Sequence, residues 1–155
     1  MITIEAAVAD DVDQLVDLQI KLFAEDSGVH ERYSDVTWPA REGRIDFERM
    51  MVGADSLVLV ARVNGSAVGF LDAYIAKAAS TRLPVSFGVL RGMYVEAEHR
   101  RGGIGQLLVG RFLSWARALG CVEAQVNAYA ANDQAQQLYL TNGFRPLSVE
   151  LVMDL

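Results

Sequence analysis

Hydrophobic residues in the first third of the chain follow a strand spacing and then a helix spacing. They recur at every second position over Ile2–Ala6, which predicts a half-buried strand. After Asp10, a preferred helix-capping residue, they recur every three or four positions, which predicts a helix that Gly28 ends. Residues 28–42 show no period and indicate a loop, and residues 41–52 predict a second helix.

The rest of the chain predicts a hairpin followed by alternating strands and helices. Residues 57–61 and 67–75 are rich in strand-forming residues and flank Asn64-Gly65, a strong two-residue hairpin turn. The further predicted elements are a strand over 85–95, a helix over 104–119 ended by Gly120, a strand over 122–128, a short helix capped by Asn132 or Asp133 that reaches Tyr139, and a last strand over 144–155.

These elements fit one α/β domain. Their order is βααββ followed by βαβαβ, without repeat, linker or low-complexity segment, which favours a single mixed central sheet with helices on both faces. The chain has 155 residues, is 52% hydrophobic and 22% charged, and is long enough to bury a sizeable core. We therefore expect residues 1–155 to form a single domain.

Composition argues against several classes of protein. Cys121 is the single cysteine, so a disulfide framework is impossible, and His30 and His99 stand alone, so no metal site is expected. The N-terminal region has no basic leader, and no apolar run approaches the about 18 residues of a membrane span. We therefore expect a cytoplasmic protein without a membrane partner.

Charge is unevenly distributed along the chain. The formal net charge is −6, which argues against nucleic acid as a partner. Residues 1–55 hold 13 acidic against 5 basic residues, whereas residues 56–155 hold 7 against 9. This split suits an enzyme that binds an anionic cofactor at one end and a cationic substrate at the other, with a scattered solvated surface as the open alternative.

A glycine-rich segment separates the strand over 85–95 from the clearest helix. In Arg100-Arg101-Gly102-Gly103-Ile104-Gly105 the glycines let a ligand approach the backbone, and the free N–H groups of the helix start attract an anion. A dinucleotide fingerprint needs a glycine where Leu108 stands, and a P-loop needs Lys-Ser/Thr where Arg111-Phe112 stand. Both of these alternatives therefore fail.

The same segment matches a different pattern, Q/R-x-x-G-x-G/A, through Arg100, Gly103 and Gly105. With this motif the sequence resembles the GNAT superfamily of acyl-CoA-dependent N-acyltransferases. Further matches are the strand end Tyr94-Val95-Glu96-Ala97-Glu98-His99 before the motif and, after it, Asn132, Ala135, Leu138-Tyr139 and Gly143-Phe144 at the family's spacing. The predicted order of elements also resembles the family fold, so the resemblance covers essentially the whole chain.

The resemblance implies a site for acetyl-CoA. In the family, two neighbouring strands splay apart and pantetheine lies between them like an additional strand, which implies backbone contacts at Met93, Tyr94 and Val95. A flexible turn for the glycines and solvated surface charge for the arginines are the alternatives. The pyrophosphate is expected against Arg101, Gly102, Gly103, Ile104, Gly105 and Gln106, with Arg100 beside them.

Two further residues take roles from the resemblance. Tyr139 stands four residues before Gly143, where a family tyrosine commonly protonates the departing CoA thiolate, and Asn132 is expected to hydrogen-bond pantetheine. The alternatives are a core aromatic residue and a helix cap. Some family members use a glutamate as base where Asn127 stands here, so the base stays open among Asp72, Glu96, Glu25, Asp26 and Glu31. The region that holds His30, Tyr33 and Trp38 resembles the family's variable wall of the acceptor site.

Together these matches predict an N-acetyltransferase that moves an acetyl group from acetyl-CoA to a primary amine of a small cationic or peptide-like acceptor, without a metal. The alternatives are a module that senses acyl-CoA without turnover and an N-acyltransferase that uses a longer acyl-CoA. The sequence leaves open whether the protein is a monomer or a homodimer.

Overall fold

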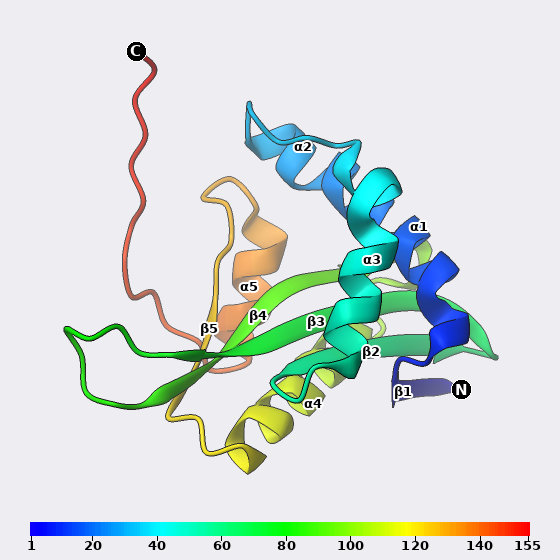
Figure 1. Ribbon diagram of the computed structural model, residues 1–155. Coiled ribbons are helices and arrows are strands. Elements are labelled where there is room, and N and C mark those ends of the chain that lie inside the picture. Colours follow the sequence, from blue (N-terminus) through cyan, green and yellow to red (C-terminus); the bar gives the residue numbers. More distant parts are fainter.

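The computed structural model describes residues 1–155 and contains one five-stranded sheet (Figure 1). The first four strands are antiparallel, whereas the fifth runs parallel to the fourth. The predicted hairpin turn is present, and Asn64 and Gly65 have the positive φ angles that it requires, 50° and 85°. In chain order, which is also their order in the sheet, the strands are β1 (Ile2–Ala6), β2 (Ser56–Val63), β3 (Ser66–Lys77), β4 (Ser86–Val95) and β5 (Glu123–Val126).

Helices cover both faces of the sheet. α1 (Val12–Glu25) and α3 (Trp38–Val52) pack on one face, and α4 (Ile104–Ala118) and α5 (Asp133–Thr141) pack on the other. Successive strand residues alternate between the two cores: Val58 and Val60 face α1 and α3, while Leu59 and Ala61 face α4. The expected α/β fold with a mixed sheet is confirmed. None of its helices is long and apolar enough to cross a membrane.

The start of α1 differs from the prediction. Residues Ala9–Asp11 form a 3₁₀ turn, and α1 begins only at Val12. Asp10 does not cap the helix; instead the buried carboxylate of Asp11 accepts a hydrogen bond of 2.8 Å from the Val8 N–H and pairs with Arg62. Asp11 stands at the position before α1, but its carboxylate is engaged with Val8 and Arg62 and caps no N–H group of the helix, so the expected cap is wrong.

The segment between α1 and α3 also differs. Ser27–His30 form a short helix, α2, so the predicted helix stop at Gly28 is wrong. The glycine serves a different purpose, because a Cβ there would lie 2.7 Å from the Phe23 carbonyl oxygen where the chain folds back. α3 begins at Trp38, earlier than expected, because Pro39 is well suited to the first turn of a helix.

The predicted last strand is absent. Residues 144–155 belong to no strand, and beyond Phe144 the chain is exposed (Figure 1). The alternation of apolar residues there specifies which face of a strand is to be buried, but a strand forms only when a neighbouring edge is within reach. The observed order therefore ends on α5.

β4 and β5 stay together over only part of their length. Their pairing runs from Phe87 opposite Glu123 to Leu90 opposite Val126, and the rest of β4, Arg91–Val95, has no partner on that side. This parting agrees with the splayed strands that the family resemblance implied. The glycine-rich segment follows directly at the end of β4.

Candidate functional site

The glycine-rich segment presents a continuous row of backbone donors. Arg101 and Gly103 have φ angles of 65° and 88°, and the first helical hydrogen bond of α4 runs from the Leu107 N–H to the Gly103 carbonyl oxygen, 3.0 Å. The six N–H groups of residues 101–106 have no acceptor within the protein. Because the dipole of α4 adds to them, this row forms an anion-binding surface.

Two glycines of this segment act in different ways. A Cβ on Gly103 would meet nothing within 4 Å, but the positive φ angle there favours glycine. A Cβ on Gly105 would lie 3.2 Å from Leu138 Cδ2, so Gly105 allows α5 to pack closely on the start of α4. This close packing brings the helix that carries Tyr139 to the anion-binding row.

The Arg100 guanidinium is hydrogen-bonded within the protein and is not free to bind an anion beside the row of N–H donors. Its Nε donates to the Val95 carbonyl oxygen at 2.8 Å and its Nη2 donates to Glu25 at 2.6 Å. Hydrogen bonding to Arg100 lowers the pKa of the Glu25 carboxyl below its usual range. Arg101 is exposed and makes neither a hydrogen bond nor an ion pair, so of the two guanidinium groups only that of Arg101 is free.

The unpaired half of β4 offers backbone groups toward the parting. The Glu96 N–H donates to the Val68 carbonyl oxygen at 2.8 Å, and Tyr94 lies opposite Phe70, so these peptide groups face β3. Alternation then directs the peptide groups of Met93 and Val95 to the opposite side. The Tyr94 side chain is buried beneath α1, where burial and its hydrogen bond to Glu25 raise its pKa to about 12.

Tyr139 lies on α5 with an unpartnered hydroxyl. Its side chain is 9% exposed and packs edge-on against Phe144, with ring centroids 5.6 Å apart, yet the hydroxyl makes no hydrogen bond within the protein. Burial, with a smaller contribution from the charge of Asp26, raises its pKa to about 12. At neutral pH the hydroxyl therefore carries its proton.

Asn132 joins two parts of the molecule. Its Oδ1 accepts the Ala135 N–H at 3.1 Å, so it caps α5, and its Nδ2 donates to Asp26 Oδ1 at 2.9 Å. Of the two caps that the sequence left open, the structure therefore selects Asn132 over Asp133.

The segment around α2 reaches the loop before α5. The Tyr129 hydroxyl donates to Glu31 at 2.6 Å, the His30 and Tyr129 rings lie 5.4 Å apart, and His30 Nε2 is 3.9 Å from Asp26. Burial and the hydrogen bond to Glu31 raise the pKa of Tyr129 above its usual range. Sequence reasoning missed Tyr129, because a lone tyrosine after a short strand gives no signal.

The remaining base candidates are held in ion pairs. Glu96 accepts from Lys21 Nζ at 2.7 Å, and Asp72, which is 1% exposed, accepts from Arg91 Nη2 at 2.6 Å. Arg91 also donates to Asp46 at 2.6 Å, so it bridges β3 and α3. Burial raises the pKa of Asp72, partly offset by Arg91.

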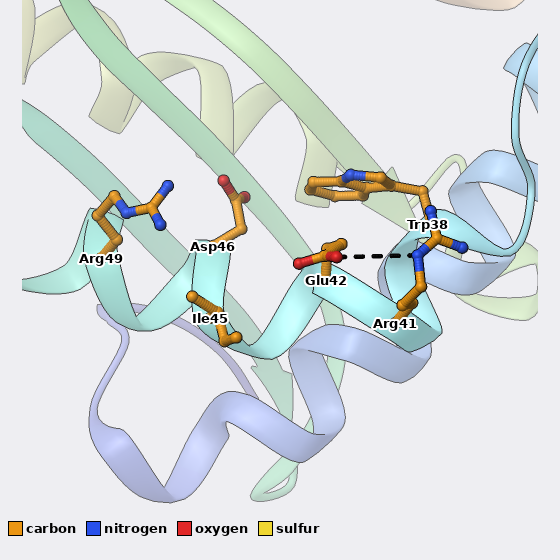
Figure 2. Close-up of a pocket in the computed structure, with 6 residues that line it drawn as sticks. All are labelled: Trp38, Arg41, Glu42, Ile45, Asp46 and Arg49. Atoms are coloured by element: carbon orange, nitrogen blue, oxygen red, sulfur yellow. Dashed lines mark ion pairs between the residues drawn. The ribbon is translucent and has the colours of Figure 1, made fainter.

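Two cavities lie on the face of α1 and α3, and Trp38 lines both. The Trp38 ring stacks on Phe23 at 5.9 Å, and Figure 2 shows it on the same side of α3 as the Asp46 carboxylate. Tyr33 is 81% exposed and lines neither. One cavity, of about 220 Å³, is lined by Gln19, Leu22, Phe23, Trp38, Phe70, Asp72, Arg91 and Gly92, and the other, of about 310 Å³, by Trp38, Arg41, Glu42, Ile45, Asp46 and Arg49.

Comparison with known proteins gives related enzymes. The sequence matches the acetyltransferase (GNAT) family over residues 19–144. It is 30% identical over 103 residues to an aminoglycoside N(6')-acetyltransferase type 1 of Acinetobacter genomosp. 13, covering 64% of this chain and 69% of that protein.

Solved structures share the fold. AAC(6')-Iy in complex with the bisubstrate analog CoA-S-monomethyl-acetylneamine is 18% identical, with a TM-score of 0.79 over 99% of this chain and 97% of that one. The aminoglycoside antibiotic 6'-N-acetyltransferase AAC(6')-Ih from Acinetobacter baumannii is 20% identical, with a TM-score of 0.77 over the same shares of the two chains.

Proposed function

The chain belongs to the acetyltransferase (GNAT) family and is an acetyl-CoA-dependent N-acetyltransferase, and from this premise we propose that it acetylates a primary amine of a small cationic acceptor. The observation that carries the proposal is the row of six free N–H groups beside the parted end of β4. In this proposal residues 1–155 form a single domain that carries both the acetyl-CoA site and the acceptor site. The named relatives act on aminoglycosides, which are polycationic amines, and this narrows the expected acceptor from cationic or peptide-like to cationic.

Acetyl-CoA fits the observed donors as a substrate. The N–H groups of residues 101–106 and the free guanidinium of Arg101 hold the pyrophosphate, and open space around Gly103 leaves room for it. The backbone groups of Met93 and the N–H of Val95, whose carbonyl oxygen accepts from Arg100, hold pantetheine, whereas the backbone groups of Tyr94 are engaged with β3. Arg100 positions the end of β4 through its bond to Val95.

Tyr139 is proposed as the general acid. Acetyl-CoA supplies a thioester whose carbonyl carbon bonds to the amine nitrogen as its carbon–sulfur bond breaks. The Tyr139 hydroxyl, protonated and without a partner, gives its proton to the departing sulfur and recovers one from solvent. Its burial in the core is compatible with this role, because the hydroxyl rather than the ring carries the chemistry.

Asp26 is proposed to accept the proton that the amine releases. Its charge reaches Tyr139, and it lies between Asn132 and His30. Asp72, Glu96 and Glu25 are already held by arginine or lysine. Of the two offered carboxylates without an arginine or lysine partner, Asp26 and Glu31, Asp26 is the one whose charge acts on Tyr139.

The preference for a cation is supported by local charges rather than by the acidic first half as a whole. Many carboxylates of that half are neutralised, among them Asp13 by Arg44 and Asp46 by Arg91. Glu31 faces no arginine or lysine, and Asp26 faces only His30. These two charges lie next to the loop that leads into α5, where an ammonium group would be attracted.

The test is an acceptor panel with acetyl-CoA and a thiol-release readout. It contains an aminoglycoside, a small diamine, a neutral amine, an acidic amino acid and a peptide N-terminus at equal concentration. We expect kcat/KM to be highest for the cationic amines. An acidic amino acid or a peptide as the best acceptor would contradict the proposal.

A further inference from the structure

Gln19, in the wall of the smaller cavity, keeps a buried polar atom without a partner. Its side chain extends from α1 and is 4% exposed, and the side-chain oxygen Oε1 accepts no hydrogen bond. Buried polar atoms in proteins are nearly always hydrogen-bonded to the protein, to water or to a ligand. An unpartnered oxygen on a residue that lines a cavity therefore indicates that the cavity receives a hydrogen-bond donor.

The surroundings of Gln19 leave its amide room to turn. A Cβ on Gly43 of α3 would lie 2.7 Å from the Gln19 oxygen, so the lack of a side chain at Gly43 makes space for the amide. The last side-chain torsion of glutamine is broad and roughly two-fold, so a half-turn exchanges the oxygen and the nitrogen. The Gln19 amide can therefore present its oxygen to a donor in the cavity.

The charged groups at this cavity are one positive charge short. Asp72, which lines it, and Asp46 of α3 share a single guanidinium, that of Arg91, whose Nη2 lies 2.6 Å from each carboxylate. Asp72 is 1% exposed and the Asp46 side chain is 17% exposed, and neither has another basic partner. Because charges shielded from water need partners, a cation in the cavity would complete the balance.

Aromatic rings complete the wall of the cavity. Trp38 and Phe23 stack with ring centroids 5.9 Å apart, and both line the cavity together with Phe70. The Trp38 indole lies on the same side of α3 as the Asp46 carboxylate (Figure 2). Aromatic faces attract ammonium groups, and tryptophan attracts them most strongly.

The cavity borders the proposed place of reaction. Gly92 lines it and lies in the unpaired half of β4, directly before Met93, and Leu22 lines it one helical turn before Asp26. Its volume of about 220 Å³ is below the about 300–1,000 Å³ of pockets that enclose whole ligands. The cavity therefore suits one end of a molecule rather than a complete acceptor.

We infer that this cavity is a subsite for a second ammonium group of the acceptor, and that Gln19 accepts a hydrogen bond from it. The inference rests on the proposed function. The acceptor is then a diamine or a larger polyamine: one amine nitrogen attacks the thioester carbonyl carbon, while the other stays in the cavity and is not acetylated. A hydroxyl group in its place would satisfy Gln19 but would leave the charges of Asp46 and Asp72 unbalanced.

Matched amines test the inference with acetyl-CoA and a thiol-release readout. Linear diamines from diaminopropane to diaminohexane are compared with the monoamine and the amino alcohol of the same length. We expect kcat/KM for the best diamine to exceed that of both matched compounds by about 10-fold or more, the effect of one charge-assisted hydrogen bond and more than the doubling that a second reactive amine gives. A monoamine or amino alcohol that reacts equally well overturns the inference.

Variants of the cavity wall separate recognition from structure. Gln19→Met keeps a side chain of similar length and removes the unpartnered oxygen, so stability should match or exceed that of wild type while the preference for diamines disappears. Asp46→Asn removes the excess negative charge and should also abolish the preference. Gln14→Met, on an exposed position of the same helix, should keep it. A preference that survives in Gln19→Met or in Asp46→Asn overturns the inference.

The same measurements distinguish a failure of this inference from a failure of the proposed function. If no diamine reacts while another amine of the acceptor panel is acetylated, this inference is wrong and the proposed function stands. If no amine is acetylated, the proposed function is wrong, and this inference is wrong with it.

Discussion

The loop at residues 100–106 and the segment at residues 26–31 both meet α5 or the loop before it, yet they present different chemical groups. The loop offers the backbone N–H groups of residues 101–106, which have no acceptor in the protein. The segment offers side chains that already have partners, as Glu31 has Tyr129 and Asp26 has Asn132. The loop can therefore bind an anion without breaking any hydrogen bond. The side chains of residues 26–31 must give up hydrogen bonds within the protein when a ligand binds to them.

The two surfaces indicate how each substrate is recognised. Peptide N–H groups bind pyrophosphate through main-chain geometry, so a few glycines and a helix start suffice. An amine acceptor is recognised through carboxylates and aromatic rings that different elements bring together, here α2 and the loop before α5. We therefore expect changes in the loop to alter acetyl-CoA binding and changes in residues 26–31 to alter the acceptor.

The largest effect is expected for Gly103→Glu. The carboxylate would enter the space around Gly103 and repel the pyrophosphate, so the affinity for acetyl-CoA should fall by about 10³-fold or more, which corresponds to about 4 kcal/mol. The positive φ angle adds a strain of about 1–3 kcal/mol, which leaves the protein folded. Calorimetric titration measures the affinity, and thermal unfolding verifies the fold.

Gly110→Ala is the matched control for this substitution. Gly110 lies in the middle of α4 with nothing within 4 Å of a Cβ, so alanine should keep the affinity and stabilise the helix by about 1 kcal/mol. If a folded Gly103→Glu protein binds acetyl-CoA with unchanged affinity, the loop is not the anion site, and the proposed difference between the two regions is wrong. Gly105→Glu is a poorer test, since Leu138 lies too close and α5 would shift.

The next effect concerns Tyr139, which stands between the two regions on α5. Tyr139→Phe keeps the buried ring and removes the proton donor, so kcat should fall by about 10²-fold while acetyl-CoA affinity and stability stay near wild type. Steady-state kinetics and unfolding measure the two quantities. Tyr74→Phe, on an exposed position of β3, is the control.

Tyr139→Ala distinguishes a catalytic role of the Tyr139 hydroxyl as general acid from a purely structural role of its ring. The cavity left in the core should cost about 3–5 kcal/mol of stability. If Tyr139→Phe retains the wild-type kcat and only the alanine variant is impaired, the ring matters and the hydroxyl does not.

The same division explains what the sequence could predict. The glycine pattern, the hairpin at Asn64-Gly65 and the helix start at Asn132 or Asp133 are local signals, and each lies where it was expected, with Asn132 as the cap. The role of Tyr129 beside Glu31 depends on residues 98 positions apart, which no local pattern encodes. The strand predicted over residues 144–155 is wrong for a related reason. Alternating apolar residues indicate which face of a strand would be buried, but they do not indicate the strand with which it would pair.

A smaller effect is expected in the pH dependence of stability. Burial raises the pKa of Tyr139 to about 12, above the ordinary value of about 10, so the folded state holds this proton more tightly than the unfolded state. The resulting stability is fully present below about pH 10 and is lost as pH rises toward 12, by about 2–3 kcal/mol. Urea unfolding of wild type and Tyr139→Phe at pH 8 and pH 11 measures it as the extra loss in wild type, because Tyr94 and Tyr129, whose pKa values are also raised, contribute equally to both proteins.

The smallest effect is expected for Glu31→Gln, which examines the acceptor side of the comparison. The substitution removes one exposed charge but keeps an oxygen that can accept from Tyr129, so only the attraction for a cationic amine weakens. Such an interaction is worth about 1 kcal/mol in water, so the acceptor KM should rise about 2- to 5-fold at low salt. At about 0.5 M salt the difference should vanish, because charges are screened over a few ångströms.

Two controls decide whether that rise belongs to the acceptor. Glu48→Gln makes the same chemical change on an exposed position of α3, beside Arg44, and should leave KM unchanged. A neutral amine should show no KM difference between wild type and Glu31→Gln, since it carries no charge to be attracted. If Glu31→Gln instead weakens acetyl-CoA binding, the separation between a main-chain anion site and a side-chain acceptor site fails, because one residue then serves both substrates.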